Sequence, residues 1–139
     1  MPGPALERWH EIVRTRDTSG LRDLLAPDAV FESPIVHTPQ RGRGLVLRYL
    51  ESAVAVLGGP DFRYVGEWFG DDGVVLEFAT RVDGLDVNGV DMIGFDPSRE
   101  RITHFKVMIR PLKAINAVHQ MMGAQLAAAQ QAVRDDGQP

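Results

Sequence analysis

An Asp-Gly dipeptide between two apolar runs is the feature that most constrains the fold of this chain. Asp83-Gly84 separates the runs Val74–Val82 and Leu85–Phe95. This dipeptide between alternating hydrophobic residues is the strongest short-range signal for a β-hairpin. The residues that flank a two-residue turn lie opposite each other, so Val82 and Leu85 share one face and the side chains alternate away from them. The sequence therefore predicts two long, paired strands in a defined register.

One face of this predicted hairpin is apolar apart from one ionisable residue, Asp91. Alternation places these residues on that face: Leu76, Phe78, Thr80, Val82, Leu85, Val87, Gly89, Asp91, Ile93 and Phe95. A buried carboxylate without a partner costs several kcal/mol or takes up a proton. Asp91 is therefore either a carboxyl group of a pocket, since such groups gather at functional sites, or a structural carboxyl that binds a backbone N–H or an arginine. A bulge or a register slip would place it in water. We predict a buried Asp91 with a pKa above the ordinary value of about 3.9.

Composition and charge restrict the partners of the chain. Its 139 residues carry a net charge of −4 without a basic run, so we expect one domain, residues 1–139, that binds no nucleic acid. Cysteine is absent and no spacing of histidines and carboxylates resembles a metal site, so we expect no metal and no other cofactor. The first residues lack the apolar segment of a signal peptide, and no apolar run approaches the ~20 residues that span a bilayer. We expect a cytoplasmic protein that does not bind membranes.

The order of the elements predicts an α+β fold. Helical spacing of apolar residues predicts helices at Pro4–Arg16, around Leu21–Leu25 and around Val46–Leu57. Alternation and turn residues predict strands at Val30–Ser33, Phe62–Phe69, Val74–Val82, Leu85–Phe95 and Arg101–Arg110. A last helix is expected at about 112–130, and the tail at 134–139 is polar. Helices that precede an antiparallel meander pack on one face of a curved sheet. The core, residues 5–110, should enclose a conical pocket at its open end.

The predicted pocket wall is apolar around Asp91. It comprises Phe31, Leu76, Phe78, Phe105, Val107 and Ile109 from strands, Trp9 and Tyr49 from helices, and Ser33 at the end of the first strand. Such a wall favours an apolar small molecule with few polar groups as the ligand. The alternative is a filled core without a cavity.

Several motifs together resemble a known superfamily. They are Arg16-Asp17, the run LLAPDAVFESP at Leu24–Pro34, Pro39–Gly42 with Tyr49-Leu50, Gly89–Phe95, and Arg101–Phe105. With them the chain resembles the small cone-shaped domains of nuclear transport factor 2, the ketosteroid isomerases and the SnoaL-like polyketide cyclases, over about Leu6–Ile109. The resemblance implies a cystatin-like cone, in which a curved antiparallel sheet wraps around N-terminal helices, here with an extra C-terminal helix. This fold hosts enzymes, adaptors and ligand binders alike.

The ketosteroid isomerases use three groups, of which this chain keeps one. Trp9 stands where the isomerases have an oxyanion-binding tyrosine, and Ser33 stands where they have the aspartate base. Asp91 matches their second oxyanion donor, a protonated aspartic acid. The resemblance therefore does not extend to ketosteroid isomerisation by the same three groups.

Two classes of function remain open from the sequence. As an enzyme, the chain would transfer a proton on a carbonyl compound in an isomerisation, cyclisation or dehydration, with Asp91 as acid or base. His37, in the loop after the first strand, is the other candidate catalytic residue, and Ser33 could assist. Glu32 is expected to point outward. The rival class is a non-catalytic ligand-binding or protein-interaction module. A second acid or base beside the substrate would favour the enzyme.

Two further expectations concern surfaces. The outer face of the sheet carries Val65, Phe69, Val75, Val90, Met92 and Met108, which predicts a homodimer through that face. The last helix carries an apolar stripe of Leu112, Ile115, Val118, Met122 and Leu126. This stripe must dock across the mouth of the cone, on the edge of the sheet or on a partner subunit.

Overall fold

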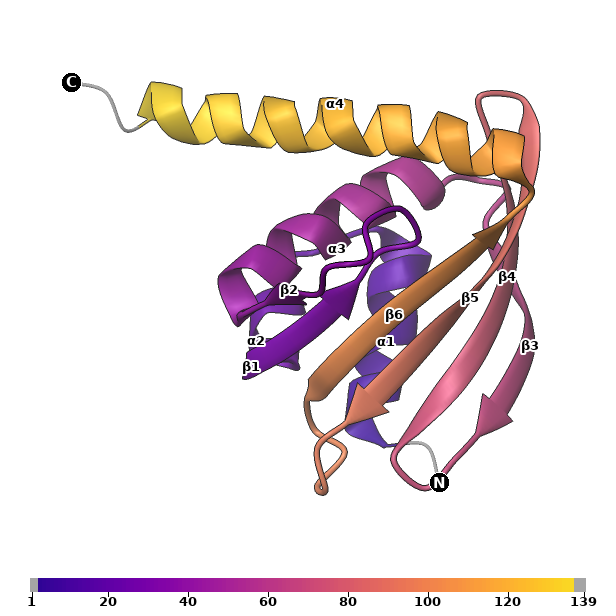
Figure 1. Ribbon diagram of the computed structural model, residues 1–139. Coiled ribbons are helices and arrows are strands. Elements are labelled where there is room, and N and C mark those ends of the chain that lie inside the picture. Colours follow the sequence, from indigo (N-terminus) through magenta and orange to yellow (C-terminus); the bar gives the residue numbers. More distant parts are fainter. Residues whose placement is uncertain (1–2, 137–139) are drawn as a thin grey trace.

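The computed structural model describes residues 3–136, with side chains described up to residue 129, and contains four helices and one curved sheet (Figure 1). The helices are α1 (Pro4–Thr15), α2 (Leu21–Leu24), α3 (Arg43–Leu57) and α4 (Leu112–Asp136). The strands are β1 (Leu25–Glu32), β2 (Gln40–Arg41), β3 (Arg63–Phe69), β4 (Gly73–Val82), β5 (Leu85–Phe95) and β6 (Ile102–Arg110). The predicted α+β fold is confirmed.

The hairpin of β4 and β5 has the register that the Asp83-Gly84 turn predicts. Val82 pairs with Leu85, and counting back from the turn pairs Leu76 with Asp91. The sheet order is β2-β1-β6-β5-β4-β3, and the pairs from β3 to β6 are antiparallel, as the meander requires. The register of this hairpin therefore decides which side chains of the two longest strands face the core.

The first strand differs from its prediction. β1 begins at Leu25, five residues before the predicted start at Val30, and it pairs in parallel with β6. The pairing shifts register between Leu25 and Val30, around Pro27, which has no N–H to give to a ladder. A parallel pair needs a long connection between its strands, here from β1 to β6. Local sequence patterns therefore do not predict this pairing.

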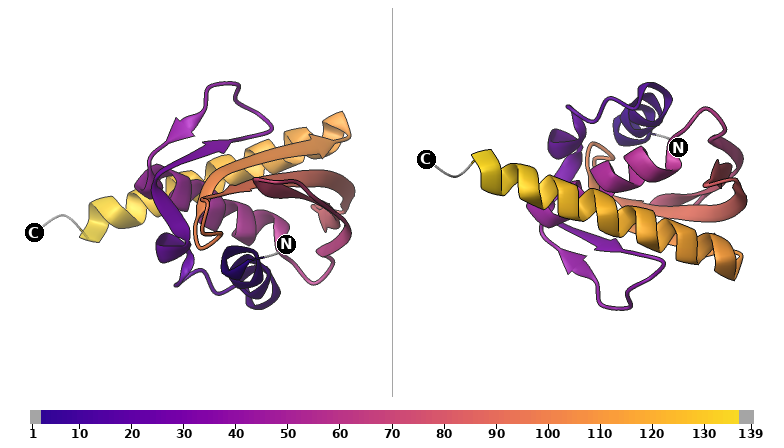
Figure 2. Two further views of the ribbon diagram at one scale, coloured as in Figure 1. Left: turned by 90° about the horizontal axis from the view of Figure 1, so that it is seen from below. Right: turned by 90° about the horizontal axis from the view of Figure 1, so that it is seen from above.

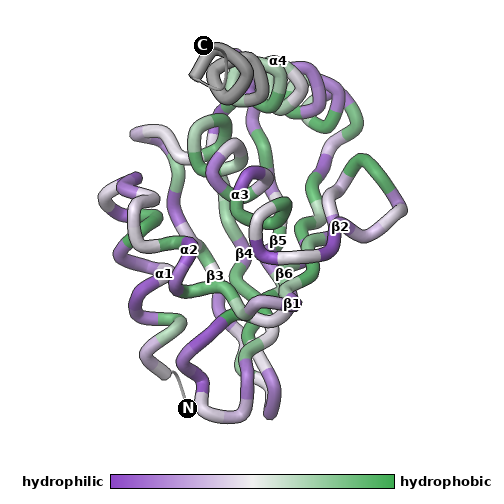
Figure 3. Tube along the Cα trace, turned by 90° about the vertical axis from the view of Figure 1, so that its left-hand side faces the viewer, coloured by the Kyte–Doolittle hydropathy of each residue, from purple (hydrophilic) through white to green (hydrophobic). Residues whose placement is uncertain are grey.

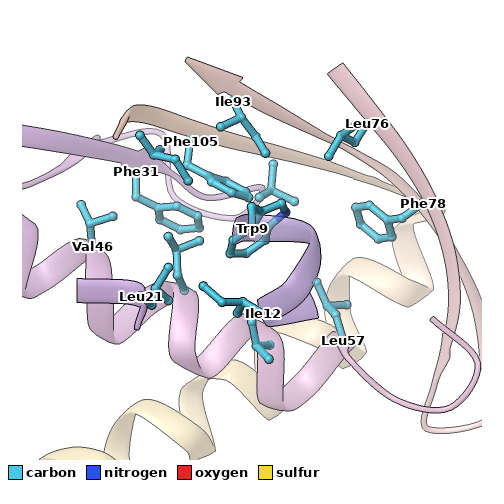
Figure 4. Close-up of a cluster of buried hydrophobic side chains, with 14 of the residues drawn as sticks. Trp9, Ile12, Leu21, Phe31, Val46, Leu57, Leu76, Phe78, Ile93 and Phe105 are labelled. Carbon is cyan, nitrogen blue, oxygen red and sulfur yellow. The ribbon is translucent and has the colours of Figure 1, made fainter. Parts of the chain in front are cut away.

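The helices α1, α2 and α3 lie in the concavity of the sheet (Figures 1 and 2). Both hydrophilic and hydrophobic residues occur along α1 and α3, as expected for helices with one buried face (Figure 3). Trp9 of α1 meets the ring of Phe105 edge-on, with 4.9 Å between ring centroids. Figure 4 shows Trp9, Phe31 and Phe105 gathered between helix and sheet, with Phe78 further along. The core thus forms between the concave face and these helices.

Gly89 makes room for one of these core rings. It pairs with Phe78 across β4 and β5. A Cβ at Gly89 would lie 2.5 Å from the Phe78 ring and 2.5 Å from the carbonyl oxygen of Met108. Only glycine therefore allows the Phe78 ring to lie over β5 at this point.

The outer face of the sheet carries an apolar patch. Trp68 pairs with Val75, which pairs with Met92, and Val90 pairs with Met108 in the next row. Val65, Trp68 and Met108 are each more than half exposed. The prediction was wrong for Phe69, because Phe69 pairs with the inward-facing Val74 and Trp68 takes the outer position. We call Val65, Trp68, Val75, Val90, Met92 and Met108 the outer-face patch.

The last helix packs on its own chain. α4 crosses the open end of the cone above α3 (Figures 1 and 2), and its Ala114 and Val118 are buried. Ile115, Met122 and Leu126 are half-buried, whereas Leu112, expected in the buried stripe, is 72% exposed because it precedes the part of α4 that packs. Of the three docking positions considered, the structure shows the one across the mouth. In the described part of the chain, no helix is both long and apolar enough to span a membrane.

Removing α4 should destabilise the protein. Deleting the chain from Lys113 onward exposes the surface that Val118, Ile115 and Met122 cover, and each large apolar side chain contributes about 1.5–3 kcal/mol when fully buried. We expect the free energy of unfolding in urea to fall by several kcal/mol. The control is Met121→Ala on the exposed side of the helix, which should change stability by less than about 0.5 kcal/mol. A truncated protein that stays soluble with an unchanged melting temperature would contradict the docking of α4.

Candidate functional site

Three polar side chains form a hydrogen-bonded chain inside the cone. The indole Nε1–H of Trp9 donates to the phenol oxygen of Tyr64 over 3.0 Å. The Tyr64 O–H donates to Oδ2 of Asp91 over 2.5 Å. These residues come from α1, β3 and β5, so the hydrogen bonds exist only when all three elements are in place. We call Trp9, Tyr64 and Asp91 the polar chain.

Asp91 reaches the interior because of the sheet register. It pairs with Leu76 on one side and Val107 on the other, both inward-facing residues, and it is 6% exposed. The geometry confirms the inward orientation that alternation from the Asp83-Gly84 turn predicts for this residue.

Tyr64 was missed by sequence reasoning, and its orientation depends on a bulge in β3. Counting from the turn that joins β3 to β4, Phe69 pairs with Val74, which would place Tyr64 opposite the outward-facing Ala79. The register shifts between Tyr64 and Gly66, so Tyr64 pairs with the inward-facing Phe78 instead. A bulge adds one residue to one strand, so the side chains beyond it point to the opposite face. The available signal was the alternation of Phe62, Arg63 and Tyr64 where β3 begins, at Arg63.

Burial has the largest effect on the pKa values of both Asp91 and Tyr64. It raises the pKa of Asp91 to about 7, against an opposing effect of the hydrogen bond from Tyr64. Burial, and to a smaller extent the negative charge of Asp91, raises the pKa of Tyr64 well above its ordinary value. Near neutral pH, Asp91 therefore exchanges between its neutral and ionised forms, while Tyr64 stays a neutral hydrogen-bond donor.

A first cavity of about 40 Å³ lies against this pair. Its wall is apolar apart from the polar chain, and it consists of Trp9, Val13, Leu50, Ala53, Val54, Leu57, Gly58, Phe62, Tyr64, Phe78, Asp91, Phe105 and Val107. Tyr64 engages Oδ2, and Oδ1 of Asp91 has no hydrogen-bond partner among the described residues. Oδ1 is therefore the oxygen that a ligand in this cavity can reach.

A second cavity, of about 130 Å³, lies beneath α4. It is lined by Phe31, Ser33, Pro34, Ile35, Val36, Tyr49, Ala53, Leu57, Val107, Ile109, Val118, His119, Met122, Gly123 and Leu126. The Ser33 hydroxyl oxygen accepts the backbone N–H groups of Ile35 and Val36, at 3.1 and 2.9 Å. Ser33 thus holds the loop after β1 in place on the wall of this cavity.

The candidate residues of the sequence analysis divide between these cavities. Trp9, Phe78, Phe105 and Asp91 line the first, Phe31, Ser33, Tyr49 and Ile109 line the second, and Val107 lines both. Leu76 lines neither and is fully buried in the core. His37 is exposed and also lines neither, so the structure does not bring it to Asp91. A catalytic role for His37 therefore has no geometric support.

Glu32 points away from both cavities. On the outer face, its Oε2 lies 2.6 Å from Nε2 of His104 and 3.5 Å from Nζ of Lys106. The hydrogen bond with His104 lowers the pKa of Glu32. Glu32 is therefore a surface carboxylate, as alternation along β1 predicts. Among residues 3–129, no cluster of three or more histidine, aspartate or glutamate side chains is arranged to hold a metal ion.

The comparisons with known proteins agree with this architecture. The family model described as a SnoaL-like domain matches residues 6–109, and the chain belongs to this family. A structure described as a steroid delta-isomerase from Pseudomonas aeruginosa is 40% identical over 91% of this chain and 92% of its own, with a TM-score of 0.86. A protein with a cystatin-like fold from Silicibacter pomeroyi is 30% identical over 94% of this chain and 91% of its own, with a TM-score of 0.83.

More distant structures share the fold alone. A nuclear transport factor 2-like protein of unknown function from Mesorhizobium loti is 18% identical over 77% of this chain and 88% of its own, with a TM-score of 0.65. Among curated proteins, none matches the chain. The predicted superfamily and cone-shaped fold are thus confirmed.

We expect Asp91 to titrate near neutral pH. In a carbon-detected NMR titration, the Asp91 carboxyl should show an apparent pKa of about 7, with the signal assigned by its loss in Asp91→Asn. Tyr64→Phe should raise this pKa further, because the hydrogen bond from Tyr64 stabilises the ionised form. An ordinary aspartate pKa in the wild type would show that the carboxyl is solvated.

Stability gives an independent check of this titration. Folding raises the pKa of Asp91, so protonation of this carboxyl contributes to the free energy of unfolding. This contribution is fully present below pH ~4 and is lost as the pH rises to about 7. The stability of the wild type relative to Asp91→Asn should therefore fall by about 1.4 kcal/mol per pH unit over that range and then level off. A difference that does not vary with pH would contradict the raised pKa.

Proposed function

We propose that the chain binds a small, mainly apolar molecule with one carbonyl or hydroxyl group beside Asp91, and that Asp91 moves a proton to or from it. The observation that carries this proposal is a titratable carboxyl held by a neutral tyrosine in an otherwise apolar cavity. A general acid or base works best with a pKa near the working pH. The pKa of Asp91, raised by burial to about 7, meets that condition.

The two protonation states of Asp91 supply two roles. In its neutral form, the carboxyl can donate a hydrogen bond from Oδ1 to a ligand carbonyl oxygen. In its ionised form, Oδ1 can accept a proton from the carbon next to that carbonyl, while Tyr64 stabilises the carboxylate through Oδ2. Such a transfer requires no cofactor and is the elementary step of isomerases, cyclases and dehydratases.

The relative from Pseudomonas aeruginosa raises the question of steroid isomerisation. The isomerases that the chain resembles use a separate carboxylate base, and Ser33 stands at that position. The Ser33 hydroxyl holds the loop after β1 and lines the second cavity, away from the polar chain. The first cavity, of about 40 Å³, and the second, of about 130 Å³, also stay below the ~300 Å³ of a site for a drug-sized ligand when taken together. We therefore propose a reaction that one carboxyl can perform on a smaller molecule.

A non-catalytic binding module is the second candidate. It is favoured by the wall of the first cavity, in which the titratable side chains are Asp91 and Tyr64. Because the pKa of Tyr64 is raised well above its ordinary value, Tyr64 cannot serve as a second acid or base near neutral pH. In this candidate, neutral Asp91 only donates a hydrogen bond to the ligand.

Hydrogen exchange in a bound ketone tests the proposal and separates the two candidates. In D₂O at pD near 7, the wild type should accelerate deuterium incorporation next to the carbonyl of small ketones, as measured by NMR. Asp91→Asn should lose about 10²-fold or more of this rate, the typical contribution of one acid–base group. Asp86→Asn, the same change at an exposed aspartate of β5, should retain it. Binding without exchange would support the non-catalytic module, and absence of binding would overturn both candidates.

We also propose that the chain forms a homodimer through its outer-face patch. The three exposed members, Val65, Trp68 and Met108, are flanked by charges of both signs, Glu77 and Lys106. An apolar patch with a polar rim is typical of an interaction surface, and a mixed charge rim can complement itself about a two-fold axis. The cytoplasmic location stays a prediction from the sequence.

Light scattering tests the dimer. The wild type at micromolar concentration should have twice the chain mass of 15.3 kDa. Met108→Glu, at an exposed position of the patch, should shift the mass to that of the monomer, because a buried unpaired charge is strongly unfavourable at an interface. Met121→Glu, at an exposed position on α4, should leave the dimer intact. A monomeric wild type would refute the proposal.

A further inference from the structure

The two cavities are neighbours that share part of their apolar lining. Ala53, Leu57 and Val107 line both of them, so the same side chains face the polar chain on one side and α4 on the other. Ala53 and Leu57 come from α3, and Val107 comes from β6. Ala53 contributes only a methyl group to this shared lining.

Inward-facing residues of β6 lead from Asp91 to the second cavity. Val107 is the direct cross-strand neighbour of Asp91, and Ile109 is the next inward-facing residue of β6. Ile109 already belongs to the second cavity. Two residues of a strand span about 7 Å, which is the length of a few methylene groups. A molecule whose oxygen lies at Asp91 therefore reaches the space under α4 with a short chain.

The chemistry of the second cavity suits an apolar group. α4 contributes the apolar side chains of Val118, Met122 and Leu126, together with Gly123 and the exposed His119. The Ser33 hydroxyl oxygen on the opposite wall is already occupied by two backbone N–H groups. Methionine adapts to ligands of different shapes because its side chain is unbranched and polarisable. The space beneath α4 thus favours alkyl or aryl groups.

We propose that the two cavities form one binding site for an elongated ligand, with one carbonyl or hydroxyl end at Asp91 and an apolar alkyl or aryl tail beneath α4. This inference rests on the proposed function, because it assumes that the polar end binds at Asp91. It assigns to α4, and to Met122 in particular, the selection of ligands by tail length. The small volume of the first cavity then restricts the polar end to a single functional group.

We call the proposed binding position of the apolar tail beneath α4 the tail site. A series of linear methyl ketones, from butanone to methyl nonyl ketone, tests it. Trp9 lines the first cavity and Trp68 is exposed on the outer face, so Trp68→Phe leaves Trp9 as the fluorescent reporter of binding. Affinity should rise about fourfold for each added methylene, the equivalent of ~0.8 kcal/mol, until the tail fills the space beneath α4. An affinity that does not increase with chain length would overturn the tail site.

Adjacent methionines supply the variant and its matched control. Met122→Glu places a charge in the second cavity and should lower the affinity for methyl nonyl ketone by about tenfold or more, with butanone binding unchanged. Met121→Glu, the same substitution at the exposed neighbour, should leave both affinities within about twofold. Leu126→Gln provides the same comparison if Met122→Glu does not fold. Equal effects of the two methionine variants on the long ketone would overturn the tail site.

The outcomes distinguish this inference from the proposed function. If butanone binds through Asp91 but longer tails add nothing, the tail site is wrong and the proposed function stands. If no ketone of any length binds, both are wrong.

Discussion

The hydrogen bond from Tyr64 to Asp91 is the interaction on which the rest of the site depends. A carboxyl group that is 6% exposed in an apolar cone would lose much of its solvation free energy without a partner. Tyr64 supplies a partner at 2.5 Å, and Trp9 in turn supports the phenol oxygen. The hydrogen bond stabilises the ionised carboxyl and burial stabilises the neutral one, and their balance leaves the pKa of Asp91 at about 7. The chemistry of the site therefore comes from two opposing effects of the fold.

Three structural elements must cooperate to form this pair. The β4–β5 register turns Asp91 inward, the bulge in β3 turns Tyr64 inward, and α1 carries Trp9 to the pair. A change in any of them would leave a buried polar group without its partner, which is more costly than a lost contact between apolar groups. The same dependence makes the polar chain a sensitive reporter of whether the cone is correctly assembled.

The fold of this chain does not by itself determine its function. The structure from Mesorhizobium loti described above shares the fold at 18% identity. A curved sheet around helices can therefore be built from very different sequences, and its shape alone specifies no chemistry. The chemistry of this chain depends on particular side chains: Trp9, Tyr64 and Asp91 inside the cone, and the apolar residues of α4 that cover its open end.

The sequence by itself determined the order of the elements, the hairpin register and the inward orientation of Asp91. These features result from local rules, namely turn chemistry at Asp83-Gly84 and the two-residue period of strands. Only the tertiary structure decided the parallel pairing of β1 with β6, the inward turn of Tyr64 at a bulge, the outer position of Trp68 in place of Phe69, and the separation of His37 from Asp91. The pairing of β1 with β6 and the position of His37 depend on residues far apart in the chain. The faces of Tyr64 and Trp68 depend instead on how β3 pairs with β4, because a shift or bulge of one residue turns a side chain to the opposite face.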